Sequence, residues 1–433
     1  MKIPYVILLL IVVLIFSWAW QPNVYTEAEP FVFGDMLPDA PALAARGDLG
    51  VGVRTIEVTN PDQLDILNRK DGTTPRYDRK LKLEVWYPAT IPDGEKELVT
   101  YDQMMGNNGD PKRPLVPFQF QGRALRNAET LKGDSPYPLI IVSHGYTGSS
   151  LLFTYLTENL ASKGYVVVSI DHTESTFQDA AAFTSTLLNR SLDQLFVLNE
   201  MARLSKEEGF LGGLLDANNT GLIGYSMGGY GALNTMGAGY SARAVQFFKG
   251  ATEGSDALLQ RAAGEEAYLN SFDDRIKAVV AFAPWGMNAG VWDAEGLRGL
   301  RTPTLFVAGS QDDISGYENG IKAIYDGATN ADRYMLTYLN ARHNVAPNPP
   351  PAVALKKGLH LDEYLRYADS VWDQKRINNI NQHFVTAFLG QILQKQDYGK
   401  YLDLEQSANA GPWEGFLPRT AVGLELHHAK AGE

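Results

Sequence analysis

The sequence of 433 residues contains no cysteine, which excludes disulfide bonds, thiolate metal ligands and a cysteine nucleophile. It is also short of basic residues, with 38 Lys and Arg against 50 Asp and Glu, and the net charge is −12. Because no arginine-rich run or basic stripe is present, we expect no nucleic-acid partner. No internal repeat or long low-complexity linker divides the chain. With 45% hydrophobic and 20% charged residues, the sequence is typical of a globular protein with a large core.

The first twenty residues carry an unusually long apolar run. Lys2 precedes the run Ile3 to Trp20, which only Pro4 and Ser17 interrupt. This pattern predicts that residues 1–20 are a signal peptide or a membrane anchor, with the rest of the chain exported to the periplasm or the extracellular space. Small residues near the end of the run, Ser17 and Ala19, favour cleavage. Cleavage and N-terminal membrane association both remain open, as does the oligomeric state.

Two kinds of strand pattern follow a loose lead-in at 21–50. Residues 51–58 and 81–87 alternate apolar and polar side chains, as half-exposed strands do. Short, continuous apolar runs are typical of strands buried on both faces, and the chain has them at 138–142, 165–170, 221–223, 278–282 and 304–307. Helical stretches at 151–162, 192–204 and 228–236 separate them. We therefore predict an α/β fold, a doubly wound, mostly parallel sheet with antiparallel N-terminal strands, over residues 51–395.

Two segments stand outside this alternation. Residues 237–275 form a helical insertion, either a lid over the site or a plain surface insertion. Residues 396–433 are predicted to be a C-terminal tail.

The polar residues that follow the predicted strands suggest one kind of chemistry. Ser226 lies in Gly224-Tyr-Ser-Met-Gly228, directly after an apolar run, and this spacing is typical of a nucleophile on a tight strand-to-helix turn. A serine hydroxyl needs a neighbouring base, and the base needs a carboxylate to hold it in one tautomer. Asp312 and His343 follow later strands, in the chain order serine, acid, histidine. We predict that these three residues form a catalytic triad.

Such a triad also needs two backbone N–H groups to stabilise a developing oxyanion. One should come from Met227, the residue after the serine, at the start of a helix. The other should come from the loop after the first buried strand, where Tyr146 is the favoured donor and its ring can also line the substrate pocket.

Each predicted role has competitors. Asp313 is an alternative acid, and Asp171, after another strand, is interpreted as a turn former. Among the other histidines, His144 is expected to fix the oxyanion loop by a hydrogen bond and His172 to be structural. His360 and His383 fall in helical stretches, and the pair His427-His428 is interpreted as exposed tail residues. We expect no metal and no cofactor.

A set of motifs resembles a known family. VSHGYTGSS, GLIGYSMGGYGA, AFAPWG, TLFVAGSQDDIS and ARHNVAP together resemble the α/β-hydrolase superfamily, over roughly residues 50 to 395. Within it they are similar to the branch of platelet-activating-factor acetylhydrolases, cutinases and dienelactone-hydrolase-like proteins. The resemblance implies the roles given above for Ser226, His343, Asp312, Tyr146 and Met227. It also implies that Trp285 lines the acyl site.

The chain departs from that branch at two points. True dienelactone hydrolases use a cysteine, which this chain lacks. Residues 237–275 have no counterpart in the small cutinases, which argues against an open cleft for polymers.

The resulting expectation is a serine carboxylic-ester hydrolase that acts through an acyl-enzyme on small-molecule, acyl or lipid-like esters. A serine peptidase of the same fold and a non-catalytic binding member are the alternatives. The first shares the triad and its order. The second is disfavoured because serine and histidine are both present.

Overall fold

The computed structural model describes residues 31–433, and the predicted signal or anchor segment at 1–20 lies outside them. Phe33–Glu433 form one unit. Among the described residues, we find no helix whose length and apolar character would let it cross a membrane.

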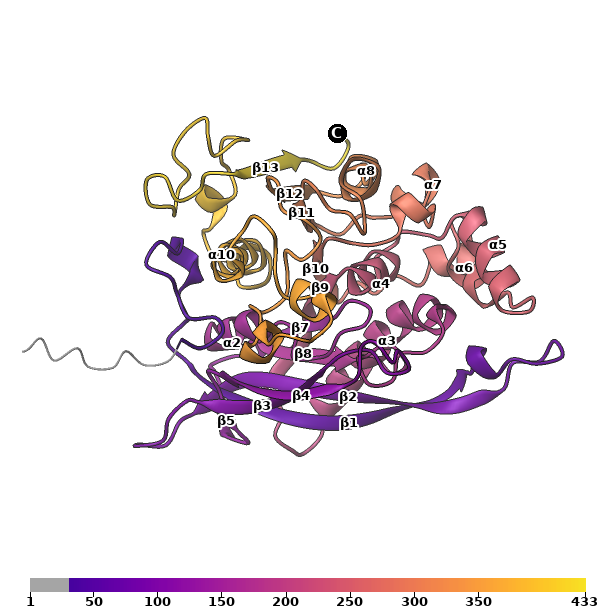
Figure 1. Ribbon diagram of the computed structural model, residues 1–433, viewed down its shortest axis with the longest axis horizontal. Helices are drawn as coiled ribbons and strands as arrows, with labels where there is room; N and C mark the ends of the chain where they lie inside the picture. Colours follow the sequence, from indigo (N-terminus) through magenta and orange to yellow (C-terminus); the bar gives the residue numbers. More distant parts are fainter. Residues whose placement is uncertain (1–30) are drawn as a thin grey trace, which may run out of the picture. The chain divides into compact units, whose positions relative to one another are not determined.

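The alternating sequences at 51–58 and 81–87 build a long two-stranded ribbon. Strand β1 (Gly50–Leu64) pairs antiparallel with β2 (Arg76–Thr90), from Gly50 opposite Ala89 to Leu64 opposite Arg76 (Figure 1). Both strands run further than predicted, because the backbone N–H and C=O groups of their polar ends pair with each other.

The continuous apolar runs form the parallel centre of the sheet. Its strand order is β13-β12-β11-β10-β9-β7-β8-β2-β1-β5, with β6 paired to β2, and β3 and β4 form a separate two-stranded sheet. The six central strands, which lie in the order β8, β7, β9, β10, β11 and β12, pair with their neighbours in parallel. At the two sides of this group, β13 pairs antiparallel with β12, and β2 pairs antiparallel with β8. The predicted doubly wound, mostly parallel sheet with antiparallel N-terminal strands is confirmed.

The remaining strands are β3 (Val99–Met105), β4 (Val116–Gly122), β5 (Leu125–Arg126), β6 (Glu129–Thr130), β7 (Tyr137–Ser143), β8 (Val166–Asp171), β9 (Leu215–Tyr225), β10 (Ile276–Phe282), β11 (Thr304–Gly309), β12 (Arg333–Tyr338) and β13 (Leu424–Ala429).

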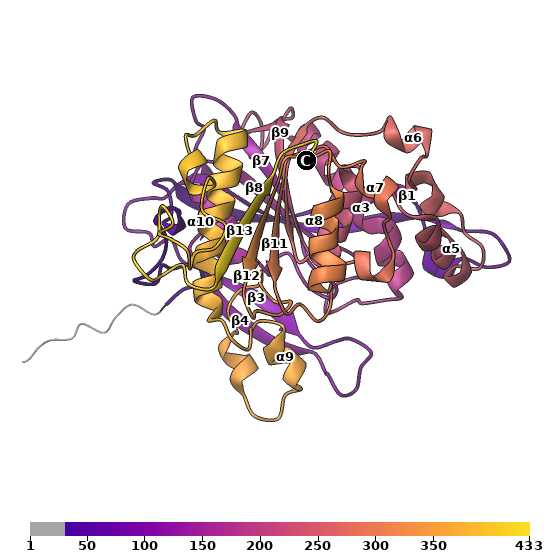
Figure 2. The same ribbon diagram turned by 90° about the horizontal axis from the view of Figure 1, so that it is seen from above.

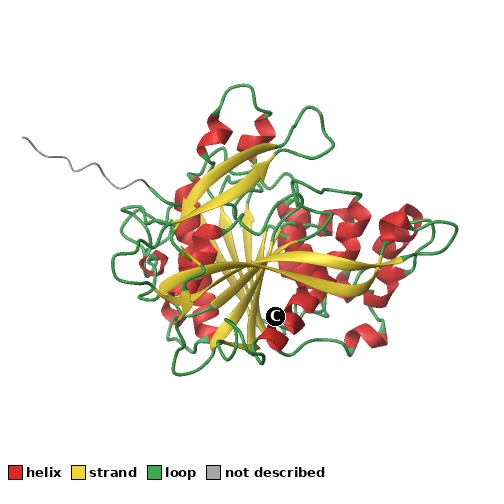
Figure 3. Ribbon diagram, turned by 90° about the horizontal axis from the view of Figure 1, so that it is seen from below, coloured by secondary structure: helices red, strands yellow, loops and turns green. Residues whose placement is uncertain are grey.

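Helices cover both faces of this sheet (Figure 3). One face carries α2 and α10, which contact each other, and the other carries α3 and α4, which also pack together. The helices are α2 (Thr154–Ser162), α3 (Phe183–Leu204), α4 (Met227–Thr235), α5 (Ala242–Ala251), α6 (Glu266–Leu269), α7 (Ala294–Leu297), α8 (Ala323–Gly327), α9 (Leu361–Leu365) and α10 (Gln374–Leu393).

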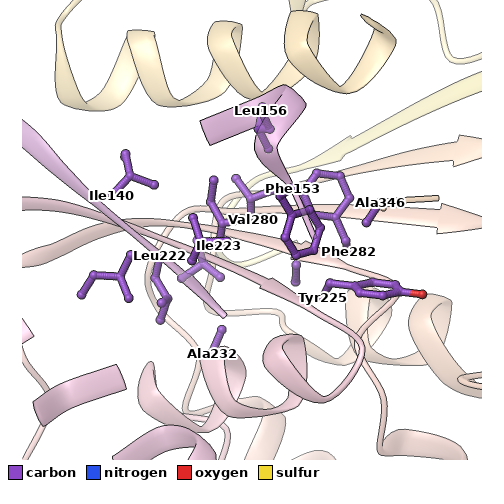
Figure 4. Packing of buried hydrophobic residues seen from close by; sticks show 14 of the residues in the cluster. Ile140, Phe153, Leu156, Leu222, Ile223, Tyr225, Ala232, Val280, Phe282 and Ala346 are labelled. Carbon is purple, nitrogen blue, oxygen red and sulfur yellow. The ribbon is translucent and has the colours of Figure 1, made fainter. Parts of the chain in front are cut away.

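The core lies between the sheet and these helices. Leu222 and Ile223 of β9 and Val280 and Phe282 of β10 are fully buried. Figure 4 shows them packed together with Phe153, which precedes α2, while the hydroxyl of Tyr225 points away from the cluster. Each such side chain contributes about 1.5–3 kcal/mol on burial, so the strand ends that carry the candidate site rest on a rigid base.

The two segments outside the predicted alternation have defined places. Residues 237–275 contain α5 and α6, which confirms the predicted helical insertion between α4 and β10. Part of 396–433, predicted as a tail, returns to the sheet, because β13 pairs antiparallel with β12 from Arg333 opposite Ala429 to Tyr338 opposite Leu424.

A buried polar cluster joins the N-terminal ribbon to the parallel strands. Arg79 of β2 donates to both carboxylate oxygens of Asp193 on α3, at 2.8 and 2.9 Å. His172, after β8, lies 2.9 Å from the same carboxylate and 2.8 Å from Ser143 Oγ at the end of β7. Burial would raise the pKa of Asp193, but the charge of Arg79 and the hydrogen bonds hold it at about 2. The carboxylate therefore stays ionised.

Three histidines are buried without charge. Burial lowers the pKa of His172 and of His383 to about 3, and lowers that of His144 well below its ordinary value. His383 of α10 accepts the backbone N–H of Leu43 at 3.1 Å, and the ring of His144 accepts the N–H of His172 at 3.2 Å. These rings act as neutral hydrogen-bond partners inside the fold.

The buried histidines predict loss of stability in acid. His172 and His383 stay neutral in the folded state between about pH 6.5 and 3 but take up protons on unfolding, so the free energy of unfolding falls as pH falls. The lowered pKa of His144 acts in the same direction. Each contributes up to about 1.4 kcal/mol per pH unit. Urea unfolding at pH 7, 6 and 5 measures how steeply the free energy of unfolding changes with pH. The His383→Gln variant should show a smaller slope, by the contribution of one histidine. A His383→Gln slope equal to the wild-type slope would contradict the assignment.

Candidate active site

Ser226 lies on a sharp turn between β9 and α4. Its φ of +52° falls in the left-handed region, which a non-glycine residue adopts at a cost. The turn is held by three backbone hydrogen bonds: the Ser226 N–H donates to the Phe282 carbonyl, and the Ser226 carbonyl accepts from Tyr230 and Trp285. This geometry turns the serine outward at the carboxyl edge of the sheet.

The two glycines around the serine are required by close backbone approach. A Cβ atom at Gly228 would lie 1.9 Å from the Ser143 carbonyl oxygen, and one at Gly224 would lie 2.3 Å from the Gly228 carbonyl oxygen. Because these neighbours are backbone atoms, no side-chain movement could relieve the overlap. The Gly-x-Ser-x-Gly spacing therefore has a direct steric cause.

His343 joins the serine to a carboxylate. Its Nε2 lies 3.0 Å from Ser226 Oγ, and its Nδ1 lies 2.8 Å from Asp312 Oδ2. The other oxygen of Asp312 accepts the N–H groups of Ile314 at 2.9 Å and Ser315 at 2.7 Å. Burial acts to raise the pKa of Asp312, but the hydrogen bond and charge of His343 and these two N–H groups hold it below its ordinary value. An ionised Asp312 fixes the ring proton on Nδ1, which leaves Nε2 free to accept a proton from the serine.

The competing carboxylates have other partners than His343. Asp313 pairs with Arg342, and its side chain is 41% exposed. Asp171 accepts the Ser150 N–H and lies 3.7 Å from Lys82 Nζ. Among the described residues, neither carboxylate hydrogen-bonds to His343, whereas Asp312 does.

The other six histidines lie elsewhere in the fold. His144 and His172 belong to the buried polar interior described above, His383 is buried in α10, and His360 precedes α9. On β13, His427 lies near Glu425 and His428 near Asp332. Among the described residues, no group of three or more histidine and carboxylate side chains is arranged to hold a metal ion.

The two expected oxyanion donors lie at neighbouring strand ends. Met227 begins α4, and Tyr146 lies in the loop after β7, the strand that pairs with β9. Among the described residues, neither N–H has an acceptor in the hydrogen-bond network. Both are therefore free to donate to a substrate oxygen.

The Tyr146 and Trp285 rings each make an edge-to-face contact with Phe183. The ring centroids are 5.4 Å apart for Tyr146 and Phe183, and 5.3 Å apart for Phe183 and Trp285. Tyr146 lines the cavity at Ser226, whereas Trp285 is not among the lining residues and touches the elbow through its backbone N–H.

A cavity of about 310 Å³ opens at Ser226 and His343. It is more polar than the sequence suggested, because three arginines and two aspartates lie among apolar side chains. The lining residues are Arg113, Gly145, Tyr146, Thr147, Gly148, Leu152, Phe177, Tyr225, Ser226, Asp313, Ile314, Arg342, His343, Asn344, Asp362, Leu365, Arg366 and Ala368.

Residues 361–368 and the β3–β4 connection supply the cavity's outer wall, and the sequence interpretation missed both. Glu363 of α9 accepts from Arg113 at 2.7 Å and from the Gly106 N–H at 2.9 Å. Arg366 donates to the carbonyl and hydroxyl oxygens of Thr147 at 2.6 and 2.9 Å. Figure 2 shows α9 near β3 and β4, with α5 and α6 on another side. No lining residue comes from 237–275, so no cavity contact supports a lid there.

Comparisons with known proteins agree with this arrangement. A family model described as PET hydrolase-like matches residues 130–247, which include the oxyanion loop and the elbow. Cutinase est1 of Thermobifida alba is 26% identical over 216 residues, covering 50% of this chain and 56% of that protein. Cutinase 2 of Thermobifida cellulosilytica is 23% identical over 217 residues, covering 50% and 64%. The matches thus span between half and two thirds of the length of these curated relatives.

A solved structure extends the likeness over most of the chain. The ferulic acid esterase from Streptomyces cinnamoneus superposes with a TM-score of 0.55 at 17% identity, covering 90% of this chain and 99% of the other. At that identity the likeness concerns the fold. This chain thus has an α/β-hydrolase fold, and its sequence is similar to cutinases and to the PET hydrolase-like family.

Proposed function

We propose that this chain is a serine carboxylic-ester hydrolase that forms an acyl-enzyme at Ser226. The observation that carries the proposal is the chain of hydrogen bonds from Ser226 through His343 to Asp312, at 3.0 and 2.8 Å. The names of the relatives, cutinases and a ferulic acid esterase, support the ester as the bond that is cleaved.

In the first half-reaction, Ser226 Oγ attacks the ester carbonyl carbon while His343 Nε2 takes the hydroxyl proton. The imidazolium that forms is stabilised by Asp312, whose carboxylate already accepts the Nδ1 proton. The tetrahedral oxyanion accepts the N–H groups of Tyr146 and Met227, and the latter stands at the positive end of α4. Collapse of this intermediate breaks the ester bond, and His343 returns the proton to the departing alcohol.

In the second half-reaction, water attacks the acyl-enzyme. His343 takes a proton from that water and then gives it to Ser226 Oγ as the acid leaves. One ester and one water thus yield one alcohol and one acid, and no cofactor is needed for the balance.

The proposed substrates are small-molecule acyl esters, lipid-like ones included. The site cavity of about 310 Å³ has apolar surface at Leu152 and Phe177 next to the oxyanion loop, and arginines on its outer wall. Its size and mixed polarity favour compact acyl groups over long chains. The apolar run at residues 3–20 supports the further proposal that the protein acts after export.

The first test is removal of the nucleophile. Ser226→Ala should lower kcat on p-nitrophenyl acetate on the order of 10⁴-fold or more, because the remaining groups cannot form the acyl-enzyme. A fluorophosphonate probe should label the wild-type protein at Ser226 and leave the variant unlabelled. Full activity of the variant, or labelling at another serine, would contradict the mechanism.

The choice of acid is tested by a matched pair of neighbours. Asp312→Asn should lower kcat by about 10⁴-fold, because an amide would favour the wrong tautomer of His343. Asp313→Asn, which removes the partially exposed partner of Arg342, should leave kcat nearly unchanged. An equal loss of kcat in the two variants would contradict the assignment of Asp312 as the acid that sets the tautomer of His343.

The substrate class is tested by acyl-chain length. Because the cavity is small and bounded by charged residues, kcat/KM should be higher for p-nitrophenyl acetate and butyrate than for the dodecanoate. The series is measured below the concentration at which the long ester aggregates. A maximum at the dodecanoate would contradict the proposed preference for compact acyl groups.

A further inference from the structure

Arg190 of α3 is a buried cation that the mechanism above does not use. The residue is 1% exposed. It lies opposite Gly231 in the helix that follows Ser226, where a Cβ atom would come within 2.8 Å of Arg190 Cβ. The last glycine of the sequence Gly228-Gly-Tyr-Gly231 therefore lets α3 approach close to the elbow.

The guanidinium of Arg190 points at the oxyanion loop. Its Nη1 donates to the His144 carbonyl at 2.8 Å, and its Nη2 donates to Ser175 Oγ at 2.5 Å. The same Nη2 lies 3.5 Å from the Gly145 carbonyl oxygen, where the contact is mainly electrostatic. Two successive carbonyl groups of the loop thus face one positive charge.

The Gly145 carbonyl shares a peptide unit with the N–H of Tyr146. This peptide bond is trans, so its C=O and N–H point in opposite directions. The ring of His144 fixes the same carbonyl: its Nε2 accepts the His172 N–H, so its proton is on Nδ1, which donates to the Gly145 oxygen at 2.6 Å. Two buried donors behind the peptide therefore direct the Tyr146 N–H away from them.

The charge of Arg190 has no counterion of its own. Among the described residues it forms no ion pair, because the nearby carboxylate of Asp193 is occupied by Arg79 and His172. Burial lowers the pKa of Arg190 to about 9, and the guanidinium still carries its charge at neutral pH. An uncompensated buried cation costs stability. A contribution to stability therefore does not explain why a charged residue is buried at position 190.

We propose that Arg190 is a positioning residue for the oxyanion hole, acting through the His144 and Gly145 carbonyls to orient and polarise the Tyr146 N–H. This inference rests on the proposed esterase function. The interaction strengthens as negative charge develops on the substrate oxygen, so it should favour the transition state over the bound ester.

Steady-state kinetics with p-nitrophenyl acetate test the proposal. Arg190→Met should lower kcat about 10²-fold with KM within about twofold. Inhibition by a trifluoromethyl ketone, which forms a charged adduct with serine, should weaken by a similar factor. Arg190→Lys keeps the charge but not the planar fork, and its loss should be about tenfold.

Arg333→Met is the matched control. Arg333 is 4% exposed and also donates to backbone carbonyls, those of Tyr325 and Ala331, but on another part of the sheet. Its replacement should lower the unfolding temperature and leave kcat unchanged. A similar kcat loss in Arg333→Met would show a general effect of instability and overturn the proposal.

Further outcomes separate this proposal from the proposed function. If Arg190→Met does not fold, Ser175→Ala, which removes one acceptor of the guanidinium, should lower kcat without changing KM. The role of Arg190 would be overturned if a folded Arg190→Met variant had wild-type kcat and wild-type inhibitor affinity. If that variant does not fold, the same result in both Ser175→Ala and Arg190→Lys would overturn it. Absence of hydrolysis and probe labelling in the wild-type protein would instead overturn the esterase function itself.

Discussion

The close approach of Gly228 to the Ser143 carbonyl is the contact on which the site depends. It brings the start of α4 against the end of β7, so that the turn at Ser226 and the loop at Tyr146 lie side by side. A methyl group at residue 228 would force these two segments apart, and with them Ser226 and the Tyr146 N–H that is proposed to bind the oxyanion.

The interior beneath the site is unusually polar for a parallel sheet. Arg79, Asp193, His172, His144 and Arg190 are all buried where the strand ends meet α3. Their hydrogen bonds reach the carbonyls of the loop and the hydroxyl at the end of β7. Burying such a network costs desolvation free energy, but its hydrogen bonds fix the orientation of the groups they join, which apolar packing does not do.

Much of this arrangement could be predicted from the sequence, because it depends on local patterns. The apolar runs predicted the parallel strands, and the order of Ser226, Asp312 and His343 predicted three residues that the structure places in contact. The choice between Asp312 and Asp313 was harder, since neighbours on one loop differ only in the direction of their side chains.

What the sequence did not predict depends on contacts distant along the chain. The cavity wall joins Glu363 to Arg113, 250 residues apart, and neither residue lies in a recognisable motif. Arg190 lies in α3 just before the helical stretch predicted at 192–204, and its burial and its contacts depend on the packing of α3 against the elbow. The prediction that Trp285 lines the acyl site came from resemblance; its ring makes an edge-to-face contact with Phe183, and Trp285 is not among the residues that line the cavity at Ser226.

The bonds of Arg366 to Thr147 have a mechanical consequence. Arg366 follows α9 in the outer wall of the cavity, whereas Thr147 adjoins Tyr146, whose N–H is the proposed oxyanion donor. Any outward displacement of this wall would have to break those bonds or pull on the loop. Under the proposed mechanism, opening the cavity on this side would therefore also disturb the loop that carries the Tyr146 N–H.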